Sequence, residues 1–272
     1  MSDIELQYVA MGAGTPAIVF IHGYASGPED WAPQAEFFGG RHRVVSVALR
    51  GHGTSERGTA EMTIEQLAAD CLAVLEAQGI DRAILAGHSM GTRVAIEGHR
   101  QAPDRVCGLI LLDGSNATAL TTLDDALGHF DRTIAERGYL GFAEPLFAQM
   151  FFDPRHDTLK QKLVARALNV PEETGKPLYQ HMIRYDAGVV PGALQMANVP
   201  ILVIQSTTRS ATGARRTLEP GEVGVYENFV LRHAPGADIV AMAGLGHYTM
   251  LEAPAEVNRT IEEWMVRHHL RA

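Results

Sequence analysis

The amino-acid sequence predicts an α/β fold, with a mostly parallel central sheet flanked by helices and a helical segment inserted into it. Two observations carry this prediction. Short continuous apolar runs alternate with stretches whose apolar residues recur at helical spacing, which is typical of a parallel sheet covered on both faces. Between 115 and 198 no strand-like run occurs, and glycines and prolines divide the segment into short helices. We therefore expect a core of residues 1–114 and 199–272, and an insertion of residues 115–198.

The expected strands differ in their hydrophobic pattern. Residues 4–10 alternate between apolar and polar side chains, as a half-buried strand does, whereas the later runs are continuously apolar. Those runs lie at 17–21, 44–49, 83–86, 107–113, 201–205 and 238–242. Continuous apolar runs of this length are typical of strands buried on both faces, so helices should cover both sides of the sheet.

Helices are expected between these strands. Thr63 opens one of them, with Gln66 three residues later in a capping-box arrangement. Another helix directly follows the run at 83–86, and a third is expected over 223–232. The last begins at Pro254 and has apolar residues at helical spacing, which indicates an amphipathic helix that packs on the core.

Composition limits the kinds of partner. The chain has 272 residues, of which 46% are hydrophobic, enough for one large α/β domain with a sizeable core. Its formal net charge of −9 argues against nucleic acid and membrane surfaces as partners, because both attract cationic patches. The first residues do not have the pattern of a secretory signal, and no apolar run is long enough to span a bilayer. We therefore expect a cytoplasmic protein that acts on a small molecule, alone or as a homo-oligomer.

The pattern Gly-x-Ser-x-Gly at 87–91 stands between a buried strand and a helix. Such a strand–turn–helix lifts the Ser89 hydroxyl clear of the sheet and places it at the positive end of the helix. Gly87 and Gly91 are needed because a side chain at either position would collide with neighbouring backbone. At this point the chain resembles the α/β-hydrolase family, whose nucleophile elbow has this pattern in this setting.

The resemblance implies a role for several residues. Ser89 would be the nucleophile, and the backbone N–H groups of Tyr24 and Met90 would form the oxyanion hole. His247 lies in a glycine-rich loop after the last strand, where the family has its general base, which a serine hydroxyl needs in order to become nucleophilic.

The acidic residue that would orient His247, the third member of the family's Ser–His–acid triad, is not where most relatives have it. Most relatives have an Asp after the strand that corresponds to 201–205, but residues 206–210 here contain no carboxylate. A minority take the acid from the end of the preceding strand, where this chain has Asp113. Asp113 is therefore the preferred acid, and Glu219 and Glu222 remain as alternatives.

Three other residues could be taken for catalytic or binding residues but are expected to be structural. His22 should orient the loop that follows the strand at 17–21, and His52 should be hydrogen-bonded inside a tight turn. Trp31 should form a wall of the packed core.

The insertion is rich in large apolar side chains, and the resemblance implies that it is a helical cap over the active site. A cap of this kind favours a mainly apolar pocket for the acyl or alcohol group. The histidines lack metal-ligand spacing, and no glycine-rich phosphate loop occurs, so we expect neither a metal nor a cofactor.

These observations favour a cofactor-independent serine hydrolase that cleaves a carboxylic ester or lactone through an acyl-enzyme on Ser89. Two alternatives from other classes stay open. One is a carbon–carbon bond hydrolase or a cofactor-free dioxygenase of the same fold, and the other is a weakly catalytic ligand-binding member.

Overall fold

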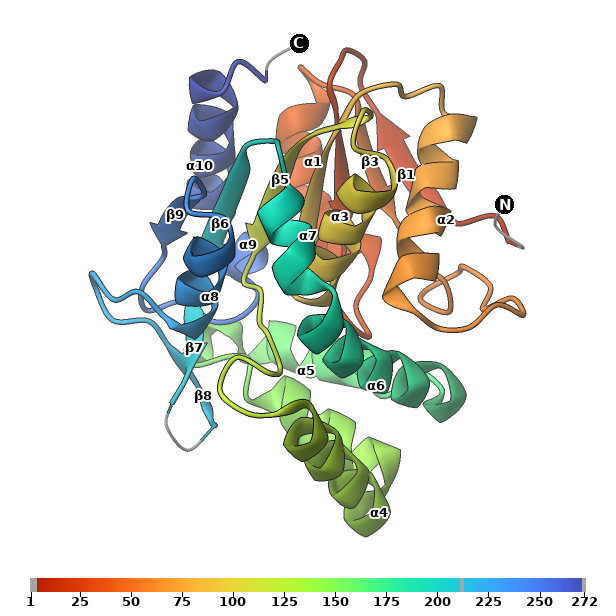
Figure 1. Ribbon diagram of the computed structural model, residues 1–272, viewed down its shortest axis with the longest axis vertical. Helices are drawn as coiled ribbons and strands as arrows, with labels where there is room; N and C mark the ends of the chain where they lie inside the picture. Colours follow the sequence, from red (N-terminus) through yellow and green to blue (C-terminus); the bar gives the residue numbers. More distant parts are fainter. Residues whose placement is uncertain (1–3, 211–212, 271–272) are drawn as a thin grey trace.

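The computed structural model describes residues 4–210 and 213–270, and within them the chain forms a seven-stranded sheet with helices on both faces (Figure 1). In spatial order the strands are β1 (Tyr8–Met11), β3 (Val44–Val47), β2 (Ala17–Ile21), β4 (Ala83–His88), β5 (Val106–Leu112), β6 (Ile201–Gln205) and β9 (Asp238–Ala241). β1 pairs antiparallel with β3, and every other pair in this sheet is parallel. The predicted fold class is confirmed.

The burial of the strands follows their hydrophobic pattern except in β9, which was expected to be buried but lies at the edge of the sheet with its residues partly buried or exposed. β2, β3, β4 and β6 are buried at every position, as continuous apolar runs predict. β1 is largely exposed at the edge of the sheet, and its ladder begins only where Tyr8 pairs with Val47, so it starts later than the predicted strand at 4–10.

The helices of the core form two groups on opposite faces of the sheet (Figure 1). One group contains α2 (Ile64–Ala77), α3 (Met90–Gln101), α7 (Val190–Met196) and α8 (Val225–His233); the other contains α1 (Ala32–Gly39), α9 (Thr249–Glu252) and α10 (Pro254–Arg267). Thr63 caps α2 as predicted, because its hydroxyl accepts the Gln66 N–H at 3.1 Å. The other half of the predicted capping box does not form, since the Gln66 side chain donates to Asp70 at 2.8 Å. α7 lies inside the predicted insertion but packs against α3 and α8.

The remaining helices of the segment between β5 and β6 are α4 (Leu123–Ala148), α5 (Asp157–Ala167) and α6 (Glu172–Gly188), with a 3₁₀ turn at Pro154–His156. Among the glycines expected to divide this segment, Gly138 kinks α4 through its positive φ of 69°, whereas Gly141 and Gly175 lie within α4 and α6 and do not break them. A Cβ on Gly175 would be 1.8 Å from the Tyr139 hydroxyl, so a glycine at this position of α6 lets α4 and α6 pack closely. Across the described residues, no helix is both long and apolar enough to cross a membrane.

Candidate active site

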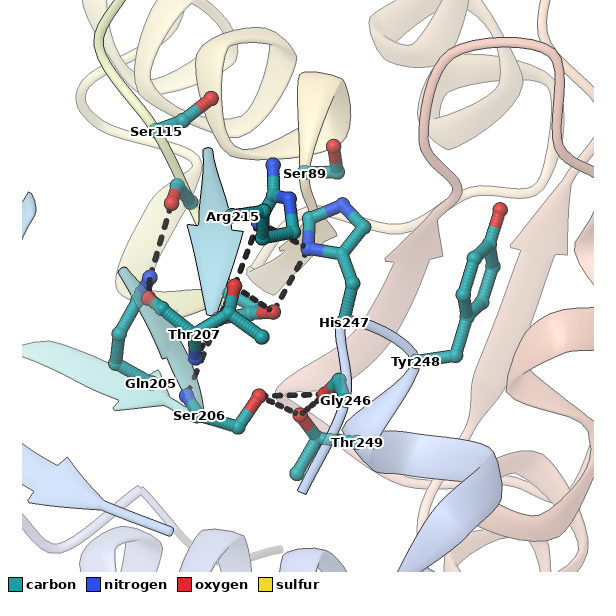
Figure 2. Close-up of polar contacts among 12 residues, drawn as sticks. Ser89, Ser115, Gln205, Ser206, Thr207, Arg215, Gly246, His247, Tyr248 and Thr249 are labelled. Atoms are coloured by element: carbon teal, nitrogen blue, oxygen red, sulfur yellow. Dashed lines mark hydrogen bonds and ion pairs between the residues drawn. The ribbon is translucent and has the colours of Figure 1, made fainter. Parts of the chain in front are cut away.

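Three polar residues follow three strands of the sheet and lie together at one edge, and two of them, Ser89 and His247, are labelled in Figure 2. Ser89 follows β4, Asp113 follows β5, and His247 lies in the loop after β9. Since these strands are parallel, their carboxyl ends lie on the same side, where ligands bind in folds of this kind. Backbone hydrogen bonds continue the sheet past its end, from the Ser89 N–H to Leu112 O at 3.0 Å and from the Asp113 N–H to Ile204 O at 2.7 Å.

The turn that carries Ser89 is strained and closely packed. Ser89 has a φ of 53° and a ψ of −113°, outside the regions that L-residues prefer. A Cβ on Gly87 would lie 2.0 Å from Gly91 O, and one on Gly91 would lie 2.4 Å from Ile21 O. Both glycines are therefore needed for the close approach that the sequence predicts.

Asp113 and His247 form a buried pair. The Asp113 Oδ2 lies 2.7 Å from His247 Nδ1, and both side chains are almost fully buried. Asp113 Oδ1 also accepts the N–H groups of Ser206 at 3.1 Å and Thr207 at 3.0 Å, and the Thr207 hydroxyl bonds the same carboxylate (Figure 2). These bonds fix the carboxylate so that it accepts the Nδ1 proton and leaves the lone pair on Nε2.

The alternative acids lie elsewhere. Glu222 binds Arg216 at 2.8 Å and accepts the Glu219 N–H at 3.0 Å, and Glu219 itself is exposed. The structure therefore brings Asp113, and neither of these glutamates, to His247.

The Ser89 hydroxyl and the imidazole are adjacent but not yet bonded. Within residues 4–210 and 213–270, His247 Nε2 is buried and has no hydrogen-bond partner, and the Ser89 hydroxyl points away from the ring in Figure 2. The loop of His247 is held in place by its own carbonyl, which accepts the His88 Nε2–H at 2.9 Å. Proton transfer requires the hydroxyl to turn toward Nε2, and such contacts are often loose before substrate binds.

The electrostatic surroundings keep the imidazole neutral. Burial holds the pKa of His247 well below its ordinary value, and the positive charges of Arg215, Arg209 and Arg93 act in the same direction. Burial raises the pKa of Asp113, while the charge of Arg215 and the bonded backbone N–H groups oppose that rise. A neutral His247 at pH 7 is the form that can accept a proton.

The loop at His22-Gly23-Tyr24 lies against the nucleophile. A Cβ on Gly23 would lie 3.2 Å from the Cβ of Ser89, so the backbone of this loop passes directly beside that serine. His22 fixes the loop as predicted: its Nε2 accepts the Leu49 N–H at 3.0 Å, and its Nδ1–H donates to Gly23 O at 2.8 Å. Tyr24 and Met90, the predicted oxyanion donors, thus belong to two segments that meet at Ser89.

The predictions for the two other structural residues are also confirmed. His52 Nε2 accepts the Ala25 N–H at 3.1 Å, and its Nδ1–H donates to Arg50 O. Trp31 is fully buried and stacks on Phe20 with 4.7 Å between the ring centroids.

A small pocket of about 40 Å³ opens beside Ser89. Apolar side chains of α4 and α6 form one wall of this pocket, namely Leu146, Phe147, Tyr179 and Met182. A larger cavity of about 770 Å³ adjoins it, because Leu146, Tyr179 and Arg209 line both. The apolar wall is the kind of surface that the sequence predicts for this segment.

Sequence reasoning missed a second part of the pocket lining, which is cationic. Strands β7 (Thr207–Arg209) and β8 (Arg215–Thr217) pair antiparallel in a separate two-stranded sheet, and Arg209 and Arg215 line the pocket. The signal in the sequence was two short Thr- and Arg-containing runs on either side of Gly213, at the place where relatives have their acid.

The sheet order, the strained serine after β4 and the histidine loop after β9 are those of the α/β-hydrolase class. A family model described as the alpha/beta hydrolase family matches residues 18–260, so the chain belongs to this family.

Individual relatives are distant. A curated relative from Acinetobacter baylyi, named (E)-2-((N-methylformamido)methylene)succinate hydrolase, is 24% identical over 95% of this chain and 93% of its own. The chain spans two thirds or less of other curated relatives, with alignments covering 65%, 42% and 30% of three of them.

Two solved structures have the same fold. One is a thermophilic esterase from Thermogutta terrifontis, with a TM-score of 0.80 and 23% identity over 98% of this chain and 94% of its own. The other is an enol-lactonase from Burkholderia xenovorans, with a TM-score of 0.78 and 20% identity over 97% of each chain.

Proposed function

We propose that the protein is a cofactor-independent serine hydrolase that cleaves a carboxylic ester or lactone. The observation that carries this proposal is the 2.7 Å contact between Asp113 and His247 beside the strained Ser89. A serine at such a turn, with a neutral imidazole oriented by a buried carboxylate, is the arrangement that acyl transfer requires.

The reaction proceeds through an acyl-enzyme. Ser89 Oγ attacks the carbonyl carbon, its proton passes to His247 Nε2, and the N–H groups of Tyr24 and Met90 stabilise the negative charge on the carbonyl oxygen. The C–O bond then breaks, and the leaving alkoxide takes the proton from His247 Nε2. A water molecule, deprotonated by His247, releases the carboxylic acid and restores Ser89.

Further contacts support this chemistry. Asp113 holds the proton on His247 Nδ1 and stabilises the imidazolium that forms during the reaction. The side chains of α4 and α6 exclude water from the carbonyl and take up the apolar part of the substrate, so we propose that residues 115–198 act as a cap.

A panel of esters and lactones tests the proposal. The parent should hydrolyse at least one member of the panel, and Ser89→Ala should not. Ser115→Ala is the control: Ser115 also lines the pocket but does not lie on the elbow, so this variant should still hydrolyse the ester. Oxygen uptake with heteroaromatic substrates, measured alongside, distinguishes the dioxygenase alternative. Oxygen uptake without ester hydrolysis would overturn the proposal.

A further inference from the structure

Arg215 is a cation in the wall of the pocket with few partners of its own. Within the part of the chain that the structure describes, its Nη1 donates a hydrogen bond to the Thr207 hydroxyl at 2.6 Å and also lies 3.0 Å from His247 Nδ1. Its Nε is buried and has no partner among the described residues. In Figure 2 the Arg215 side chain lies beside the His247 ring, and Arg215 lines the pocket together with Ser89.

The two fully buried arginines, Arg50 and Arg93, and the partly buried Arg166 are each paired with a carboxylate. Arg50 donates twice to Asp70, at 2.7 and 2.9 Å, and Arg93 donates twice to Asp186, at 2.7 Å for both bonds. The partly buried Arg166 likewise holds both oxygens of Asp30, at 2.8 and 2.6 Å.

Arg215 and Arg209 lack such a partner. No carboxylate in residues 4–210 or 213–270 forms a salt bridge with either, and the nearby Asp113 is already bound by His247 and two backbone N–H groups. The contact with His247 does not replace a counter-ion, since Nδ1 donates its proton to Asp113 and so offers no lone pair to Arg215. Among the described residues, Arg215 therefore has the charge of Asp113 nearby but no direct salt bridge, and a second cation, Arg209, stands beside it in the pocket lining.

The pocket itself carries positive charge. Arg209 and Arg215 line it together with Ser89 and His247, and no carboxylate is among its described lining residues. Arg209 also lines the adjoining larger cavity, so one cation faces the wider space and the other faces the reacting groups. In a chain with a formal net charge of −9, this is a local reversal of sign.

We propose that the substrate is an ester or lactone that carries a carboxylate, which Arg215 binds beside Ser89 while Arg209 attracts it into the pocket. The inference rests on the proposed function. A carboxylate fits best because its two oxygens match the planar guanidinium fork, and it would give Arg215 the direct salt bridge that Arg50 and Arg93 form within the protein. The apolar wall of α4 and α6 then covers the chain between the carboxylate and the reacting carbonyl.

A matched pair of substrates tests the charge directly. Monoethyl glutarate carries the carboxylate, and its carboxamide analogue has the same shape without the charge. Since a hydrogen bond to a charged group stabilises by about 1.5–3 kcal/mol, the parent should prefer the acid by about 10- to 100-fold in kcat/KM. Equal kcat/KM for the two esters, or a preference for the amide, would overturn the inference.

Variants assign the preference to the arginines. Arg215→Gln should reduce the acid-to-amide ratio of kcat/KM to about 3-fold or less, and Arg215→Lys should restore part of it. Arg216→Gln is the matched control: Arg216 follows on the same strand, binds Glu222 at the surface, and should leave the ratio unchanged. If Arg215→Gln lowers kcat/KM for both esters by the same factor, Arg215 acts through His247 or the hairpin, and the inference fails.

A binding readout separates this inference from the proposed function. Free glutarate should slow fluorophosphonate labelling of Ser89 in the parent, and glutaramide should not; Arg209→Gln should weaken this protection even if Arg215→Gln does not fold. If Ser89 is labelled and glutarate does not slow the labelling, the carboxylate site is contradicted but the proposed function is not. A folded parent that is never labelled would contradict the proposed function itself.

Discussion

The two sides of the pocket are built in different ways. One side is the carboxyl edge of the sheet, where strand ends and backbone hydrogen bonds fix Ser89, Asp113 and His247. The other side consists of α4, α6 and the β7–β8 hairpin, which present large apolar side chains and two arginines. We infer from this difference that the backbone of the fold positions the groups proposed to react, whereas the surrounding segments determine which substrate binds. Changes on the first side should therefore reduce kcat for every substrate, and changes on the second should alter KM and selectivity.

The largest loss is expected at the general base. His247→Gln should lower kcat by about 10⁴-fold or more for any ester, because His247 is the proposed acceptor of the Ser89 proton. Steady-state assays on two unrelated esters measure this. A loss for one ester and not the other would show that His247 selects substrate and does not act as the base.

The second-largest loss is expected at Asp113, the proposed acid of the triad. Asp113→Asn should lower kcat by about 10²- to 10⁴-fold, since the amide can no longer hold the required tautomer of His247. Glu219→Gln is the control and should stay within about 2-fold of the parent, as surface substitutions away from a site have small effects. Near-equal rates for Asp113→Asn and the parent would refute the assignment of the acid.

A smaller effect is expected on the apolar wall. Met182→Ala should raise KM for an ester with an apolar acyl chain by about 3- to 10-fold, because lost methylene contacts weaken binding by about 1 kcal/mol. Leu140→Ala is the matched control, since Leu140 is an exposed apolar residue of α4 that lies outside the pocket lining. A fall in kcat with KM unchanged would place Met182 with the catalytic groups.

The smallest effect concerns pH. Groups facing His247 are Asp113 after β5, His88 on β4, Arg93 on α3, and Arg209 and Arg215 on the hairpin. Since burial and the arginine charges lower the pKa of His247, kcat/KM should fall only as pH drops below about 6.5, the ordinary pKa of histidine.

Arg215→Gln tests the cause of that shift. Removing one positive charge favours the imidazolium, so the pKa of His247 rises and the acid limb of the profile moves to higher pH by up to about one unit. A profile that moves to lower pH, or stays unchanged, would contradict the electrostatic role of Arg215.

The sequence predicts the catalytic edge better than the surrounding walls. Glycine spacing and continuous apolar runs fix where strands end, so the neighbourhood of Ser89 and His247 follows from local pattern. The hairpin does not follow, because strands of three residues leave almost no periodicity and Arg215 reaches the site only through tertiary folding. Gly175 was misjudged for a similar reason: its role is close packing against Tyr139 across two helices.

The most direct test of the central claim is the intact mass of the protein after exposure to a fluorophosphonate. An activated Ser89 predicts one adduct on the parent, one on Ser115→Ala and none on Ser89→Ala. Asp113→Asn should be labelled far more slowly, because its imidazole is no longer oriented. An adduct that persists on Ser89→Ala, or a folded parent that acquires none, would contradict the assignment of Ser89 as the nucleophile.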